Sequence, residues 1–170
     1  QPQAFPEEAA AVMEADLVTG SANRRSLLAD IQKVLDSGER LVHITPHEKG
    51  EAFEELPMER FEGHTRAFIK VEDGCNRQCA YCVIPRARGR VRSRSVESVL
   101  EELRALSAAG YREVVLSGIN LPSYGLDTGV SLVSLIEQAA TVPGIRRIRL
   151  GSLEPDLLSD EDMARLAKVE

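Results

Sequence analysis

The sequence predicts an α/β protein in which strands and helices alternate along most of the chain. Short apolar runs rich in Val, Ile and Leu lie between longer segments of helical period, and Gly or Pro separates them. Repeated strand–helix units imply parallel strands with right-handed crossovers, as in a barrel or a doubly wound sheet. The pattern lacks an opening strand and stops after a strand–helix unit, so we expect a fragment with material missing at both ends.

Residues 1–46 contain two short helix–strand units, which we assign to the C-terminal part of a small N-terminal α/β domain. The expected helices are FPEEAAAVMEA (5–15) and NRRSLLADIQKVLDSG (23–38), and the expected strands are DLVTG (16–20) and RLVHITP (40–46). Pro6 and two acids suit the first turn of the first helix, while Asn23 can cap the second helix and Gly38 can end it.

Residues 47–63 show no clean period and hold six glutamates against two basic residues, which is typical of an acidic linker. Residues 64–170 then repeat a strand–helix unit three times. The expected strands are RAFIKVE (66–72), REVVLSG (112–118) and IRRIRLGS (145–152), and the expected helices are SVESVLEELRALSAAG (95–110), SLVSLIEQAATV (131–142) and SDEDMARLAKV (159–169). Three such units do not close a barrel by themselves.

The composition is that of a globular protein, with 43% hydrophobic and 28% charged residues. We expect no contact with membranes, because no apolar run approaches the ~20 residues that cross a bilayer. Three cysteines within eight residues suit a metal or redox role in a reducing compartment better than a disulfide framework. These features indicate a cytoplasmic protein.

All three cysteines lie in one predicted loop, as Cys75, Cys79 and Cys82 with the spacing C-x-x-x-C-x-x-C. Three thiolates can hold a 4Fe–4S cluster and leave one iron open to a small molecule. A zinc site usually needs four ligands, and His64 is the nearest candidate for the fourth. Three ordinary buried cysteines are a further alternative. Of these readings, the open cluster is favoured by the spacing.

Five arginines follow the cysteines at every second position: Arg86, Arg88, Arg90, Arg92 and Arg94. Residues 75–94 hold six arginines and no acid, so the rest of a chain with net charge −6 carries about −12. If this stretch is extended, the five guanidinium groups share one side and could follow a phosphate backbone. The alternative is a solvated loop whose arginines pair with the acidic linker.

Two further strand ends carry polar residues and glycines. In parallel α/β folds, ligands bind at the carboxyl ends of the strands. The candidates here are Gly118, Asn120, Ser152 and Glu154, which could contact a small cofactor. They could equally be turn glycines and solvent-facing loop residues. His43, His47 and His64 stand alone in the sequence and are expected to be ordinary structural histidines.

The run CNRQCAYC after a strand resembles the signature of radical S-adenosylmethionine (SAM) enzymes, including an aromatic residue before the last cysteine. The resemblance implies that Cys75, Cys79 and Cys82 bind a 4Fe–4S cluster whose open iron binds SAM. It also implies that Tyr81 packs near the adenine and that the Gly118 backbone faces the cofactor amino group. One-electron reduction then produces a 5′-deoxyadenosyl radical, a chemistry that belongs to the cofactor. We therefore assign no residue as an acid–base catalyst.

A longer set of motifs resembles the methylthiotransferases, in particular the bacterial branch that acts on threonylcarbamoyladenosine in tRNA. The motifs are GCNRQCAYCVIPRARGRVRSR, LSGINLPSYG and RIRLGSLEP. The implied reaction adds a methylthio group to carbon 2 of the modified adenosine beside the anticodon. Its implied partners are tRNA, SAM, an electron donor and a sulfur source. The implied fold is the first half of a radical-SAM partial (β/α) barrel over residues 64–170.

Proteins of this family also have an N-terminal second 4Fe–4S cluster and a C-terminal RNA-binding domain. The ligands of that second cluster are absent here, so this chain alone is expected to be inactive. Two alternatives to the threonylcarbamoyladenosine enzyme stay open. One is a non-catalytic zinc- or cluster-binding nucleic-acid module. The other is a sister methylthiotransferase that acts on isopentenyl-adenosine tRNA or on a ribosomal protein.

Overall fold

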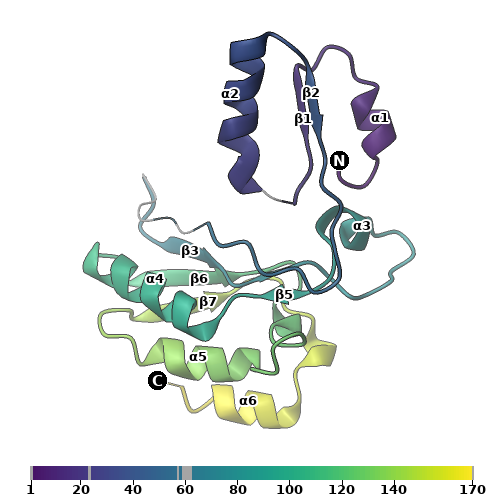
Figure 1. Cartoon of the computed structure of the whole chain (residues 1–170). Helices are drawn as coiled ribbons and strands as arrows, with labels where there is room; N and C mark the ends of the chain where they lie inside the picture. Colours follow the sequence, from purple (N-terminus) through teal and green to yellow (C-terminus); the bar gives the residue numbers. More distant parts are fainter. Residues whose placement is uncertain (1, 23, 57, 59–62, 170) are drawn as a thin grey trace. The chain divides into compact units, whose positions relative to one another are not determined.

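The computed structural model describes residues 2–22, 24–56, 58 and 63–169 of the chain. Its architecture is mixed α/β with parallel sheets, as the alternation of strands and helices predicts (Figure 1). The chain divides into two compact units. The first consists of residues 1–54 and 74–90, and the second of residues 55–73 and 91–170. No helix in the described part of the chain is long and apolar enough to cross a bilayer.

The first unit has a two-stranded parallel sheet, β1 (Leu17–Thr19) and β2 (Leu41–His43), in the register Leu17↔Leu41. The connection between them contains the short 3-10 turn η1 (Arg24–Ser26) and the helix α2 (Leu27–Ser37). Helix α2 ends at Gly38, whose φ of 66° is a conformation that glycine adopts at little cost. The expected N-cap Asn23 lies outside the described residues.

Two short helices complete the first unit. Helix α1 (Pro6–Ala10) begins with the predicted proline and has Glu7 and Glu8 in its first turn. Helix α3 (Ile84–Arg88) follows the cysteines and was not predicted. Pro85 stands in the first turn of α3, and Gly89, with a φ of 73°, follows its last residue. A proline start and a glycine stop explain why these residues form a helix.

The second unit contains the parallel sheet β3–β6–β7, formed by Ala67–Lys70, Glu113–Ser117 and Arg147–Leu150. Strand β6 is central, with Ile69↔Leu116 on one side and Val114↔Ile148 on the other. Helices α4 (Val96–Ala108) and α5 (Leu132–Ala140) connect the strands, and α6 (Asp160–Leu166) follows β7. These are the three strand–helix units that the sequence predicts.

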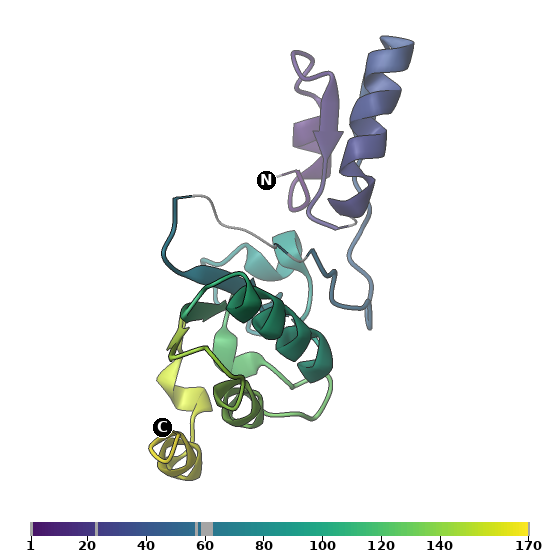
Figure 2. The same cartoon turned by 90° about the vertical axis from the view of Figure 1, so that its left-hand side faces the viewer.

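Alternate residues of the strands and the inner faces of α4 and α5 form one core. Figure 2 shows the same ribbon turned by 90°. Val99, Leu103 and Leu106 of α4 are fully buried in this core. Helix α5 contributes Leu135 and Ala139, which are also fully buried. Ser95 and Ser131 cap these two helices, because their hydroxyl oxygens accept the amides of Ser98 and Ser134. Burial of this apolar surface holds the carboxyl ends of the strands in place.

Two short strands lie beside the cysteines in sequence. Strand β4 (Glu72–Asp73) pairs antiparallel with β5 (Arg92–Ser93) in the register Glu72↔Ser93. The pair brackets the segment 74–90, so the chain leaves the second unit at Asp73 and returns to it at Val91. The two units differ in extent from the predicted domains 1–46, 47–63 and 64–170, whose boundaries stay a prediction.

Candidate functional site

The cysteines belong to residues 74–90, here called the cysteine segment, which is closed at its base by backbone contacts. Gly74 has a φ of 83°, and a Cβ at this position would lie 2.0 Å from the carbonyl oxygen of Arg90. The Cys75 amide donates to the carbonyl oxygen of Gly89 at 3.1 Å. Only glycine fits at position 74, because any side chain would collide with the backbone.

All three cysteines are free thiols and none is fully buried. Cys79 is exposed, and Cys75 and Cys82 are half-buried. The Arg77 amide donates to Cys75 Sγ at 3.4 Å. The Cys82 amide donates to the Cys79 carbonyl at 3.0 Å and tightens the turn between them. The segment therefore offers thiols that a metal could reach.

The ligand set is not assembled in advance. Among the described residues, no three His, Cys, Asp or Glu side chains come together as a metal site. His64, the predicted alternative zinc ligand, stands edge-on to the Phe68 ring with centroids 6.1 Å apart. Tyr81 is 93% exposed, so its ring is open to stack on a ligand.

The helical part of the cysteine segment is attached to the N-terminal residues of the same unit. The Arg86 guanidinium donates to the Ala4 carbonyl at 3.0 Å and lies 5.0 Å from the centroid of the Phe5 ring. The Ser21 hydroxyl donates to the carbonyl oxygen of Ala87. These contacts fix the orientation of α3 within the unit.

A chain of hydrogen bonds extends from Ser21 through His47 to Glu51. His47 Nε2 lies 2.9 Å from Ser21 Oγ, and His47 Nδ1 lies 2.6 Å from Glu51 Oε1. Because the Ser21 hydroxyl donates to Ala87, His47 Nε2 must donate to Ser21 Oγ. The arrangement is therefore an anchor for α3 rather than an activated serine, whose proton would have to point at the histidine.

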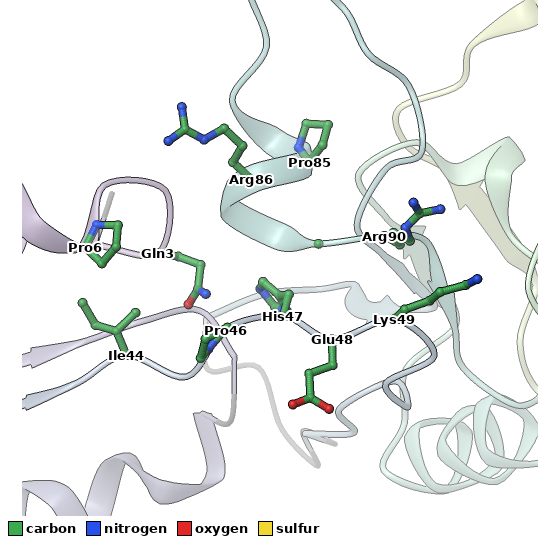
Figure 3. A pocket seen from close by; sticks show the side chains of 11 residues that line it. Gln3, Pro6, Ile44, Pro46, His47, Glu48, Lys49, Pro85, Arg86 and Arg90 are labelled. Carbon is green, nitrogen blue, oxygen red and sulfur yellow. The ribbon is translucent and has the colours of Figure 1, made fainter.

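A cavity of about 390 Å³ lies between α3 and the residues that follow β2 (Figure 3). Three basic side chains line it, Lys49, Arg86 and Arg90, against the single acid Glu48. His47 also faces this space with its ring held at both nitrogens. The cavity is thus predominantly cationic, but its residues already have protein partners at several atoms.

The five arginines do not form the extended ladder that their spacing suggests. Arg86 and Arg88 belong to helix α3, so the period-two pattern is interrupted there. Arg92 and Arg94 are only 6% and 5% exposed. Arg92 lies 3.4 Å from Asp73, and Arg94 is paired with Glu102 of α4 and donates to Ser98 at 3.0 Å. These two arginines stabilise the second unit and have no exposed guanidinium group for a phosphate.

The strongest polar site in the second unit was not predicted and centres on Glu72. This carboxylate is completely buried at the end of β4, and its Oε2 accepts the amides of Ile119 at 2.7 Å and Asn120 at 3.0 Å. Burial raises the pKa of Glu72 to about 7, against the lowering effect of the two amides. The only signal in the sequence is a pair of acids, Glu72 and Asp73, directly before Gly74 and Cys75.

Gly118 and Asn120 lie against this carboxylate. A Cβ at Gly118 would lie 2.5 Å from Glu72 Oε2 and 3.0 Å from Glu72 Cβ, so a larger residue would displace the acid. Asn120 is 4% exposed. Among the described residues, two buried side-chain oxygens lack any hydrogen-bond partner, Glu72 Oε1 and Asn120 Oδ1. Each of these oxygens is thus a buried acceptor whose donor is not among the described contacts.

The end of β7 lies beside the end of β6. The Leu121 amide donates to the carbonyl of Ser152 at 3.1 Å, which brings the turn after Gly118 against the residues after Gly151. Ser152 has a φ of 54°, a left-handed conformation that is uncommon for a residue other than glycine. Glu154 is exposed and precedes the short helix η3 (Pro155–Leu157). The structure thus brings Ser152 against the turn that holds Gly118 and Asn120, while the cysteines belong to the other unit.

Comparison with known proteins identifies the family. The model of the radical SAM superfamily matches residues 69–170, which include the whole cysteine segment and all three strand ends. The chain belongs to the radical SAM superfamily. Membership in this superfamily implies a 4Fe–4S cluster and SAM as cofactors.

Curated relatives include several radical SAM methylthiotransferases. Threonylcarbamoyladenosine tRNA methylthiotransferase MtaB of Chlamydia pneumoniae is 50% identical over 109 residues, which cover 64% of this chain and 26% of that protein. Its namesake in Aquifex aeolicus is 38% identical over 157 residues, 89% of this chain and 37% of that protein. The tRNA-2-methylthio-N(6)-dimethylallyladenosine synthase of Pelotomaculum thermopropionicum is 42% identical over 142 residues, 82% of this chain and 32% of that protein.

The chain therefore spans between about a quarter and two fifths of the length of these relatives. Within its own length, it is similar to tRNA methylthiotransferases at identities of 38% to 50%.

Proposed function

We propose that this chain is the central part of a radical SAM methylthiotransferase that modifies carbon 2 of N6-threonylcarbamoyladenosine in tRNA. One observation carries the proposal: three free, reachable thiols stand on one closed loop at the start of the superfamily match. The identity of 50% to a protein named for that substrate supports the choice of branch.

The donor set fits the cofactors of the superfamily. Cys75, Cys79 and Cys82 would hold the 4Fe–4S cluster, because thiolates are the usual ligands of such clusters. When bound, the cluster and SAM supply the one-electron chemistry that removes hydrogen from an unreactive aromatic carbon. The chain itself has to bind the cofactor, orient it and exclude water around it.

The residues at the strand ends fit the donor groups of SAM, which carries an ammonium and two ribose hydroxyls. The orphan oxygens Glu72 Oε1 and Asn120 Oδ1 are acceptors that such donors would satisfy. Gly118 lets the turn pack directly on Glu72, and we assign Ser152 and Glu154 as polar groups from the neighbouring strand end. We assign Tyr81 to the adenine because its exposed ring is free to stack.

We assign tRNA contact to Arg86, Arg88 and Arg90 of the cysteine segment and no longer to Arg92 and Arg94. Arg86 and Arg90 are exposed and Arg88 is half-buried, whereas the other two are buried beside acids. Guanidinium groups at the surface can neutralise phosphates and release counterions. A tRNA substrate also places the protein in the cytoplasm.

The remainder of the reaction is assigned to parts of the longer protein. A second 4Fe–4S cluster, an electron donor and a sulfur source are required by the proposed methylthiolation. The three cysteines of this chain form one ligand set and leave none for a second cluster. We therefore expect the isolated chain to bind cofactor without completing turnover.

The test is anaerobic reconstitution of the chain with iron and sulfide, followed by electron paramagnetic resonance of the reduced protein. We expect a 4Fe–4S signal that changes on addition of SAM, and loss of the signal when the three cysteines are replaced by alanine. Gln78→Ala, in the same loop, is the matched control and should keep the signal. Tight binding of zinc with no iron would overturn the proposal and leave a metal-stabilised module.

A second candidate is the same reaction on dimethylallyladenosine in tRNA, because a relative at 42% identity has that name. The full-length protein separates the two candidates when it is incubated with tRNA bearing either modified adenosine. Mass spectrometry of the nucleosides then shows which one gains the methylthio group. Methylthiolation of a ribosomal protein, with neither tRNA modified, would contradict both.

A further inference from the structure

We propose that Glu72 is a positioning residue that holds the turn after β6 in the conformation that receives SAM. The inference rests on the proposed function, because it assigns that turn to the cofactor. Glu72 acts through Ile119 and Asn120 and is not assigned any part in the chemical steps.

The contacts of Glu72 are those of a buried brace between two separate segments. A single oxygen, Oε2, accepts two consecutive amides, from Ile119 at 2.7 Å and from Asn120 at 3.0 Å. Glu72 itself is fixed by the β4–β5 pairing opposite Ser93 and is fully buried. Two amides held by one fixed acceptor leave the turn little freedom, since their loss would leave two buried donors unpaired.

Gly118 makes the close approach possible. The distance of 2.5 Å between a hypothetical Cβ and Glu72 Oε2 shows that the carboxylate occupies the space a side chain would need. The glycine at this strand end is therefore explained by the acid beside it, without any need for a positive φ. Glu72 and Gly118 form one structural unit.

The brace also sets the polarity of the strand end. Consecutive amides that point outward make a binding site for anions. Here the amides of Ile119 and Asn120 point at Glu72, so the turn cannot offer them to a carboxylate or a phosphate. The orphan acceptors Glu72 Oε1 and Asn120 Oδ1 remain, and they favour a ligand group that donates.

The charged neighbours of Glu72 on its own strand region are Lys70 and Asp73. Lys70 lies 2.5 Å from Asp73, and Arg92 of β5 lies 3.4 Å from the same carboxylate. These partners balance the charge of Asp73. The hydrogen bonds that Glu72 accepts among the described residues come from the backbone amides of Ile119 and Asn120. The Glu72 carboxylate therefore accepts the amides of the turn, whereas Lys70 and Arg92 pair with Asp73.

The experiment compares Glu72→Ala and Glu72→Gln with the control Glu113→Gln, an acid of β6 that pairs with exposed Arg149. Each 170-residue variant is reconstituted anaerobically, and the dissociation constant of SAM is measured by calorimetry. We expect Glu72→Ala to weaken SAM binding at least about tenfold, since it leaves two donors unpaired. We expect Glu72→Gln to stay within about threefold, because its carboxamide oxygen can accept both amides. The cluster signal should be the same in all variants.

A second measurement needs neither cluster nor SAM. In the ¹⁵N-labelled chain, the amide protons of Ile119 and Asn120 should shift together as pH is raised, and this shift should vanish in Glu72→Gln. Hydrogen exchange at both amides should become faster in Glu72→Ala. The inference is overturned if the chemical shifts and exchange rates of these amides are the same in the variants as in the wild type. It is also overturned if Glu72→Ala binds SAM as tightly as the wild type. If the wild type forms no cluster, the proposed function fails instead.

Discussion

Helices α2 and α4 are both amphipathic and have 11 and 13 residues, but α4 packs on the larger sheet. Five residues of α4 are buried, whereas none of α2 is. Leu103 of α4 is fully buried, and Leu35 of α2 is 72% exposed. Helix α4 packs on a three-stranded sheet and α2 on two short strands. An apolar stripe therefore predicts a helix, but the number of strands beneath it decides how much of the stripe is buried.

The largest expected effect concerns the ion pair that α4 makes with Arg94. Both side chains are at least nine-tenths buried, at 5% and 7% exposure, so Glu102→Ala leaves an uncompensated guanidinium inside the unit. We expect a loss of about 3–5 kcal/mol in the free energy of unfolding. Urea denaturation measures it. The control Glu137→Ala breaks the half-exposed pair with Arg165 and should cost less than about 1 kcal/mol.

A matched pair of leucines tests the comparison directly. Leu103→Ala should lower the free energy of unfolding by about 2–5 kcal/mol, because it leaves a cavity under α4. Leu35→Ala in α2 should change it by less than about 0.5 kcal/mol. Equal effects in urea denaturation would show that α2 is as well covered as α4, and would break the comparison.

The third prediction concerns Glu72, the buried acid of strand β4 in the second unit. The pKa of Glu72 is about 7 in the folded chain, above the ordinary value of 4.5. Between these two values the unfolded chain loses its proton while the folded chain keeps it. The contribution of Glu72 to the free energy of unfolding should therefore be greatest below about pH 4.5, fall as pH rises to about 7 and level off above it. The loss is on the order of 3 kcal/mol.

Urea denaturation from pH 4.5 to 8 measures this slope, and Glu72→Gln isolates it from the other titrating groups. The variant should lack the part of the slope that Glu72 contributes. Lys70 and Asp73 also act on Glu72, in opposite directions, and both are unchanged in the variant. Identical slopes in the two proteins would contradict the raised pKa.

The sequence predicts the long elements well because their signals are local. The helices over 95–110 and 131–142 and the three strands of the larger sheet are confirmed. The elements that were missed among the described residues include α3 with five residues and β5 with two. Strand β5 exists only because it pairs with β4, and no local pattern indicates such a partner.

The arginines show where a periodic pattern misleads. Their spacing predicts one exposed side only if the backbone is extended, but Pro85 and Gly89 start and stop a helix within the run. The burial of Arg94 depends on Glu102, which is eight residues away on α4. Glu72 was missed for a similar reason, because its partners Ile119 and Asn120 are distant in sequence. The three cysteines are predicted as cluster ligands from their spacing alone, and their role stays a prediction.

The closed base of the cysteine segment has a consequence for the kinetics of assembly. The contacts that close it, from Cys75 to the Gly89 carbonyl and between Gly74 and Arg90, involve no sulfur atom. The conformational entropy of bringing the two ends of this loop together is thus lost when the polypeptide folds, rather than when iron arrives. A cluster that oxygen has destroyed could then be rebuilt on the same loop without refolding of the sheet that flanks it.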